Sequence, residues 1–129
     1  MRKVTERTRK LAFRTIKVVV AQAASEQPFL TYSDLAERLE ISNRTGQGLA
    51  KILDEAAEMC RENGHPDVSV MVVTKASLDA GSPMPSPGSF VDGKTKVSGI
   101  SETEVPAEQA RVRDYHWATE APTVVGEIR

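Results

Sequence analysis

The sequence is poor in features that would point to several common classes of protein. It contains one cysteine, Cys60, so no disulfide can form within the chain and nothing favours an oxidising compartment. No run approaches the roughly 18 apolar residues that cross a bilayer, and the first residues are too charged to form the apolar region of a secretory signal. We therefore expect a cytoplasmic protein that has no membrane-spanning segment.

Residues for metal binding or nucleophilic catalysis are also scarce. His65, His116 and Cys60 do not have the spacing of a structural metal site, which needs four ligands in recognisable pairs. Cys60 lies within a predicted helix, where a thiol usually serves as a small buried apolar group. The serines of the proline-rich stretch 80–89 have no histidine placed to activate them. We expect no metal, no cofactor and no enzymatic activity.

Charge is nearly balanced overall but unevenly distributed along the chain. The formal net charge is −1, yet residues 1–18 carry seven basic side chains and one acid, whereas residues 19–70 carry four bases and nine acids. The basic segment fits an arm that reaches for an anionic partner, and it equally fits a solvated helix face. Both interpretations stay open at the level of the sequence.

Apolar spacing predicts three helices in the first half of the chain. Residues 6–24 repeat apolar side chains such as Phe13 and Val20 every three or four positions. The run Val18 to Val20 broadens this stripe enough to serve either the core or a homodimer contact. A second helix is expected at about 32–40, and a third is expected from Ser42 to about residue 63.

The ends of these helices carry recognisable signals. Thr31 and Asp34 have the spacing of a capping box, and Ser42 is a good cap for the third helix. Gly64 is placed for a left-handed helix stop, and Pro66 follows two residues later to prevent continuation. The boundaries of the second and third helices are therefore well signalled.

The second half of the chain predicts strands and turns. The segment 67–74 is short and rich in valine, which predicts a strand with Val68, Val70 and Val72 on one face. The stretch 80–89 has three alternating prolines and can form neither a helix nor a central strand. Residues 90–100 form a second strand or a hairpin arm around an Asp-Gly turn.

The chain is expected to close with a short helix. Pro106 opens this helix, which runs to Trp117 and buries an aromatic end, and residues 118–129 form a flexible tail. The resulting order predicts an α+β fold of the winged helix-turn-helix type, mainly helical with a small antiparallel β-hairpin wing. We expect one domain over residues 1–117, with a proline-rich wing loop at 82–104.

A resemblance to a known family supports this arrangement. LTYSDLAERL resembles the start of the helix-turn-helix in the DNA-binding domain of alkylguanine-DNA alkyltransferases and alkyltransferase-like proteins, and NRTGQGLA is similar to the recognition-helix run of that family. The resemblance covers about residues 31–73. It implies that Arg44 stands where the family has its intercalating arginine, Gly48 where it has its second glycine, and Tyr32 where a tyrosine contacts a DNA phosphate.

The chain also departs from that family. The alkyl-accepting Pro-Cys-His-Arg is absent, and Thr74 and Lys75 stand at the comparable place. No alkyl transfer is therefore expected. The valine-rich segment, the glycine-proline loop and the terminal Tyr-His-Trp further resemble small winged-helix modules of bacterial and phage proteins.

These observations lead to two hypotheses. The first is a non-enzymatic protein that contacts duplex DNA through the second helix of the helix-turn-helix, where polar side chains at a helix start suit base edges and phosphates. Its predicted contact residues are Tyr32, Ser42, Asn43, Arg44, Thr45, Gln47, Lys51, Lys94 and Lys96. The alternative is a small bacterial or phage inhibitor or adaptor that binds another protein, which the near-neutral charge and the acids of residues 19–70 favour.

Overall fold

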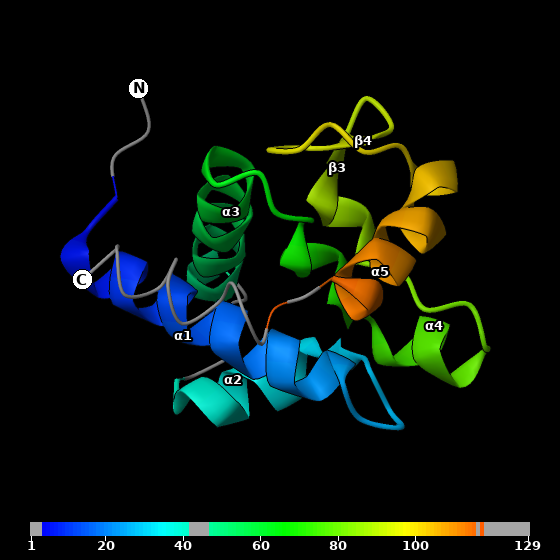
Figure 1. Ribbon diagram of the computed structural model, residues 1–129, viewed down its shortest axis with the longest axis horizontal. Coiled ribbons are helices and arrows are strands. Elements are labelled where there is room, and N and C mark those ends of the chain that lie inside the picture. The colour runs from blue at the N-terminus through cyan, green and yellow to red at the C-terminus, as the bar shows by residue number, and fades with distance from the viewer. Residues whose placement is uncertain (1–3, 42–46, 116, 118–129) are drawn as a thin grey trace.

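The computed structural model describes residues 4–41, 47–115 and 117 (Figure 1). Helices predominate, and the β-structure of the described residues consists of two small two-stranded sheets. In chain order the elements are α1 (Glu6–Ala23), β1 (Leu30–Thr31), α2 (Tyr32–Leu39), α3 (Gln47–Glu62), the 3-10 turn η1 (Val68–Met71), β2 (Val72–Val73), α4 (Lys75–Asp79), the 3-10 turn η2 (Pro87–Ser89), β3 (Phe90–Val91), β4 (Lys94–Thr95), the 3-10 turn η3 (Glu102–Glu104) and α5 (Val105–Asp114). The expected combination of predominant helix with little sheet is confirmed.

Helix α1 is a central part of the core. It packs against α2, α3, η1 and α5. Its fully buried side chains are Leu11, Ala12, Thr15, Ile16, Val19 and Ala23. Phe13 and Val20, which the spacing placed in the apolar stripe, are half-buried at its border together with Val18. The run Val18 to Val20 therefore contributes to the core of its own chain, and a homodimer through α1 stays a prediction.

The predicted helix ends are confirmed where they can be seen. The Thr31 hydroxyl accepts the Asp34 N–H at 3.1 Å, and the Asp34 carboxylate accepts the Thr31 N–H at 3.4 Å, which completes the capping box. Gly64 has a φ of +72°, and the His65 N–H donates to the Cys60 carbonyl at 2.9 Å. This is the Schellman arrangement, in which a glycine in the left-handed region ends the helix.

The valine-rich segment 67–74 is not the strand that the sequence predicted. The Asp67 carboxylate accepts the Ser69 N–H at 2.9 Å and caps η1, so only the short β2 is extended, and it pairs in parallel with β1. Every residue from 68 to 73 except the half-buried Ser69 is buried. A run buried on all sides lacks the alternation that distinguishes a half-exposed strand, so the side-chain cap determined the local conformation.

The proline-rich stretch 80–89 contains no α-helix and no strand, as predicted, although it includes the three-residue 3-10 turn η2. Helix α4, just before it, was not predicted. The Thr74 hydroxyl accepts the Ser77 N–H at 3.1 Å and caps α4, and the Lys75 ammonium lies 3.1 Å from the Asp79 carboxylate. Together, a cap and a charge pair four residues apart support a helix of only five residues.

The predicted hairpin arm is present. Strands β3 and β4 pair antiparallel, with Val91 opposite Lys94. Asp92 and Gly93 between them have φ values of 55° and 79°. Positive φ at both central residues is what a type I′ turn requires, and Asp-Gly is a favoured pair there.

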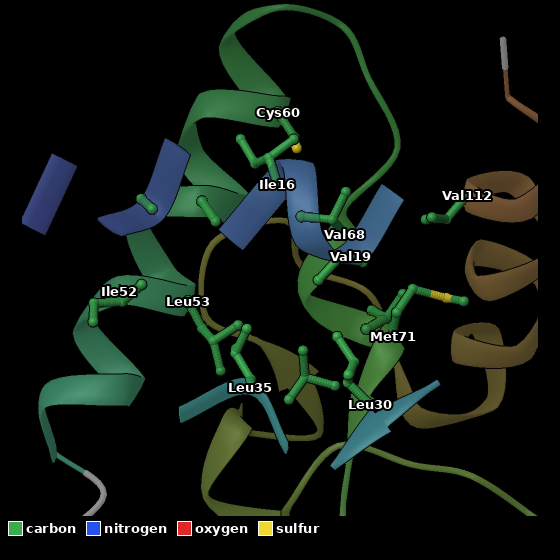
Figure 2. Close-up of a cluster of buried hydrophobic side chains, with 14 of the residues drawn as sticks. Ile16, Val19, Leu30, Leu35, Ile52, Leu53, Cys60, Val68, Met71 and Val112 are labelled. Atoms are coloured by element: carbon green, nitrogen blue, oxygen red, sulfur yellow. The ribbon is translucent and has the colours of Figure 1, made fainter. Parts of the chain in front are cut away.

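One hydrophobic cluster joins α1, α2, α3, η1 and α5 (Figure 2). The predicted final helix is confirmed as α5, with Pro106 in its first turn, but α5 ends at Asp114 and does not run to Trp117 as expected. Trp117 is 5% exposed, and its indole N–H donates to the Val112 carbonyl at 2.7 Å. The aromatic end therefore packs the end of α5 into the core.

None of the described helices is long and apolar enough to cross a membrane.

Candidate nucleic-acid interface

The corner between α2 and α3 carries most of the predicted contact residues. Helix α2 ends where Glu40 adopts a left-handed conformation with a φ of 59°, and α3 begins at Gln47. Ser42, Asn43, Arg44 and Thr45 lie outside the described residues. Their expected contacts with DNA therefore stay predictions. The Gln47 side chain and residues 118–129, the expected flexible tail, also lie outside the described part of the chain, so the predictions for them stay open as well.

The first turns of α3 present one side to solvent. Gly48, Ala50 and Lys51 are exposed, whereas Leu49 and Ile52 are buried. Among the described residues, a Cβ atom added at Gly48 would meet no atom within 4 Å beyond its chain neighbours and the backbone of its own helix. Packing within the described chain therefore does not require a glycine at this position, although glycine in a helix costs up to about 1 kcal/mol relative to alanine.

The acids of α3 differ in their exposure to solvent. Glu55 is 4% exposed, and its carboxylate lies 3.7 Å from the Arg9 guanidinium of α1. Glu58, one turn further along α3, pairs with Arg61. Asp54 is half-buried. The buried Glu55 therefore does not repel a phosphate at the outer face of α3, whereas Glu37 of α2 and Glu40 at the end of this helix are exposed before the corner.

Tyr32 lies in the first turn of α2, and its hydroxyl is bound to the proline-rich loop. The phenol oxygen accepts the Ser86 N–H at 2.8 Å and lies 3.3 Å from the Ser89 hydroxyl. The side chain thus ties this loop to α2. The resemblance implies a phosphate contact at this position, and that contact stays a prediction, while within the chain the hydroxyl binds the Ser86 N–H.

Replacing Tyr32 by phenylalanine is expected to lower the free energy of unfolding by about 1 kcal/mol, because the Ser86 N–H loses its acceptor in a half-buried place. Chemical denaturation measures this change. Ser89→Ala, which removes the longer contact with Tyr32 and a 3.5 Å contact with the Ser86 hydroxyl, should cost less. An unchanged stability with weaker DNA binding would instead assign the hydroxyl to a phosphate.

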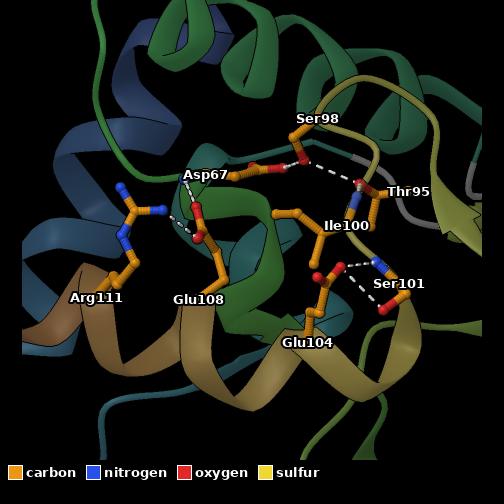
Figure 3. A network of polar contacts seen from close by, with 8 residues as sticks. All are labelled: Asp67, Thr95, Ser98, Ile100, Ser101, Glu104, Glu108 and Arg111. Atoms are coloured by element: carbon orange, nitrogen blue, oxygen red, sulfur yellow. Dashed lines mark hydrogen bonds and ion pairs between the residues drawn. The ribbon is translucent and has the colours of Figure 1, made fainter.

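A polar network holds the hairpin against the rest of the molecule (Figure 3). The Thr95 hydroxyl accepts the Ile100 N–H at 2.9 Å and lies 2.9 Å from the Ser98 hydroxyl. Ser98 in turn donates to the carboxylate of the buried Asp67. The Asp67 N–H donates to Glu108 of α5 at 2.7 Å. The hairpin is therefore connected through side chains to both η1 and α5.

The return of the chain from the hairpin to α5 is capped as well. The Ser101 N–H donates to the Glu104 carboxylate at 3.0 Å, and this bond holds the pKa of Glu104 below its ordinary value. The ionised Glu104 carboxylate therefore stabilises the fold above the ordinary pKa of the group, and this stabilisation is lost as the pH falls through the lowered pKa. The Ser-x-x-Glu spacing of Ser101 and Glu104 is a capping signal that can be recognised in the sequence. The hydrogen bond between Asp67 and Ser98 joins residues far apart in the chain, so no local pattern predicts it.

A cleft of about 300 Å³ separates the N-terminal half of α3 from the hairpin side of the molecule. Leu49 and Leu53 of α3 line one wall, while Thr95 and Lys96 lie on the other. Lys96, like Lys94 on β4, is exposed. The tertiary structure thus brings the predicted lysine Lys96 to a cleft beside the predicted recognition helix.

Cys60 is unsuited to nucleophilic chemistry. The thiol is 2% exposed, and burial raises its pKa to about 12. The thiol therefore stays protonated at neutral pH. Burial of the neutral thiol stabilises the fold fully below pH 9, and this stabilisation is lost as the pH rises toward 12. The expectation that Cys60 is a small buried residue is confirmed.

His65 and Tyr115 form another pair that local patterns did not predict. The His65 Nδ1 atom lies 2.7 Å from the Tyr115 hydroxyl, and the two rings meet edge to face. Within the described part of the chain, no three His, Cys, Asp or Glu side chains gather in a way that could hold a metal ion.

Comparison of the chain with protein-family models, with curated proteins and with solved structures gave no match.

Proposed function

We propose that the protein is a non-enzymatic DNA-binding protein of the winged-helix type. In this proposal α2 and α3 form the helix-turn-helix, the start of α3 enters a groove, and the β3–β4 hairpin is the wing. The order of these elements supports the proposal, as do the cleft that places Lys96 beside α3 and the resemblance of residues 31–73 to the DNA-binding domain of the alkyltransferases. The buried, protonated Cys60 fits a protein that transfers no alkyl group.

The single observation that carries the proposal is the open space at Gly48. A glycine that a neighbouring helix required would show close atoms around the position of a Cβ, and the described residues outside its own helix place none within 4 Å. An exposed glycine in the first turns of a helix instead lets an external molecule approach the backbone closely. In a helix-turn-helix these turns are the ones that enter the major groove.

Charge at this surface also suits a duplex. Lys51 is exposed on α3, and Lys94 and Lys96 are exposed on and next to the hairpin. Lysines at these positions can contact phosphates on either side of a groove, where they position the protein without reading the sequence. Base readout would then come from the polar run Asn43 to Gln47.

Gly48→Ala tests the proposal through two effects of opposite sign. The added methyl group is expected to raise the free energy of unfolding by about 0.5 to 1 kcal/mol, because it meets no atom of the described residues beyond its own helix and chain neighbours. It should also weaken duplex binding by about tenfold, equivalent to about 1.4 kcal/mol, because the backbone can no longer approach the DNA. Thermal unfolding and fluorescence anisotropy measure the two effects.

The control lies at the other end of the same helix. Gly64 has a φ of +72°, so Gly64→Ala should lower stability by about 1 kcal/mol and leave duplex affinity unchanged. If Gly48→Ala stabilises the protein and binds DNA as the wild type does, the start of α3 is not in a groove.

The cleft supports a second candidate function, a module that binds another protein. Its α3 wall combines the apolar Leu49 and Leu53 with the carboxylate of Asp54, and Tyr32 and Ser89 supply hydroxyl groups. An apolar wall with a few polar groups suits a side chain of a partner protein. A stoichiometric protein partner that is retained after nuclease treatment of a lysate would favour this function.

A further inference from the structure

The outer face of α1 carries a row of basic side chains. Arg7, Lys10, Arg14 and Lys17 are all exposed and stand three, four and three residues apart. These spacings place them on one side of a helix with 3.6 residues per turn. We call these four residues the basic stripe. The sequence left open whether this segment is an arm or a helix face, and the structure shows that from Glu6 onward it is a helix face.

Little negative charge opposes the stripe among the described residues of α1. Glu6 is the acid of this helix, and its carboxylate lies 3.7 Å from the Lys10 ammonium with both side chains highly exposed. Such exposed pairs contribute little and are screened by salt. The Arg14 guanidinium donates to the backbone carbonyl of Arg38 in α2 at 3.3 Å, whereas the Arg38 guanidinium donates to the Gln22 Oε1 atom at 2.9 Å.

The dimensions of the stripe match a phosphate backbone. At a rise of about 1.5 Å per residue, Arg7 and Lys17 are about 15 Å apart along the axis. One strand of duplex DNA passes about four phosphates in that length, since its rise is about 3.4 Å per nucleotide. Because a strand also winds around the duplex axis, the straight stripe spans this axial length without matching each phosphate in turn, and it is long enough to contact more than one of them.

The composition of the surface argues against a membrane as the partner. An interfacial helix needs an apolar face that enters the lipid beside its basic face. The apolar face of α1 is buried, with Ala12 and Val19 at 0% exposure. Among the described residues, the exposed large hydrophobic side chain is Val91, which lies on the hairpin rather than beside the stripe.

The stripe points away from the proposed DNA-binding surface. It lies opposite the side of α1 that packs against α3, η1 and α5. Figure 1 shows α1 in the lower half of the molecule, just above α2, and the β3–β4 hairpin at the upper edge. A straight duplex held by α3 and the hairpin therefore does not run along the stripe.

We propose that the basic stripe binds the phosphate backbone of a second DNA duplex, so that one protein molecule bridges two duplexes. The bridging rests on the proposed function, because α3 and the hairpin hold the first duplex. The stripe itself contacts phosphates only, so this second contact is independent of DNA sequence.

A bridging assay tests the proposal. A biotinylated mixed-sequence duplex is fixed on beads and loaded with protein, and the retention of a second, fluorescent duplex is measured. The variant is Arg7→Gln with Lys10→Gln and Lys17→Gln, which leaves the Arg14 contact in place. The control removes three exposed charges elsewhere, by Arg61→Gln, Lys75→Gln and Arg113→Gln. Circular dichroism and sedimentation establish that both variants are folded and that the oligomeric state is unchanged.

The wild type and the control are expected to retain the second duplex. The stripe variant should retain at least about tenfold less, because it loses three phosphate contacts and the counterion release that accompanies them. Its affinity for a single duplex, measured by anisotropy, should stay close to that of the wild type. Glu6→Gln, which removes the acid beside Lys10, should increase retention.

Three outcomes would overturn the proposal. The first is equal retention of the second duplex by the stripe variant and by the control, whether one protein molecule or a dimer holds the two duplexes. The second is loss of single-duplex binding in the stripe variant while Arg44→Ala with Lys94→Ala and Lys96→Ala binds normally. That result would mean that the protein binds DNA through the stripe alone, and it would contradict the proposed function as well. The third is stripe-dependent binding to vesicles of anionic lipid without any bridging of DNA.

Discussion

The affinity for a single mixed-sequence duplex is expected to fall about 10²-fold when the salt concentration rises from about 50 mM to about 200 mM. The proposed surface supplies four cations, Arg44, Lys51, Lys94 and Lys96. Each phosphate that a cation neutralises releases condensed counterions, so four contacts predict a slope of about −3.6 in a plot of log affinity against log salt. Fluorescence anisotropy at several salt concentrations measures this slope.

Arg44→Ala separates this surface from a general attraction of positive charge. The variant is expected to bind about 1 to 3 kcal/mol more weakly if Arg44 contacts a base, and to show a slope smaller by about 1 if it contacts a phosphate. Lys75→Ala is the matched control, because Lys75 is exposed on α4 and pairs with Asp79. It should change neither quantity appreciably.

The absence of binding at low salt would contradict the DNA-binding proposal directly. Binding that does not respond to salt would contradict it as well, since a duplex contact through lysine and arginine must release counterions. Either result would move the proposal to a protein partner at the cleft between α3 and the hairpin.

Leu35→Ala is expected to lower the free energy of unfolding by about 2 to 5 kcal/mol. Leu35 is 0% exposed and projects from α2 into the central cluster. Removing its branched end loses the transfer free energy of the buried carbons and leaves a cavity that the neighbouring α1 and α3 can fill only in part. Because typical domains are stable by about 5 to 15 kcal/mol, this is a large fraction of the total.

Val91→Ala is the control for this prediction. Val91 is 55% exposed on the hairpin, so removing its methyl groups should change stability by less than about 0.5 kcal/mol. Urea denaturation of both variants measures the difference. A small effect of Leu35→Ala would mean that α2 is held to the core less tightly than its burial indicates.

Local signals predicted most of the helical structure. The apolar repeats of residues 6–24 and 32–40, the Thr31 capping box and the Gly64 stop lie within a few residues of the features they produce, so each can be recognised in the sequence. The Asp-Gly turn of the hairpin belongs to the same kind of evidence.

The same local reasoning failed where burial is complete. The segment 67–74 combines valine-rich composition with burial on all sides, and a short apolar run of this kind has no period that distinguishes a strand from a 3-10 turn. The cap that Asp67 provides determined the outcome. Helix α4 was missed because its five residues are too few for a periodic pattern.

The candidate site divides in the same way. The sequence alone determined the residue types, a glycine and polar side chains at the start of a helix and lysines near a hairpin turn. Only the tertiary structure decided that Lys96 lies at a cleft beside α3 and that the Tyr32 hydroxyl binds the loop at Ser86. It also decided that the basic side chains of α1 lie opposite the side of this helix that packs against the core. These relations join residues far apart in the chain, and they depend on how the helices pack around one core rather than on any local pattern.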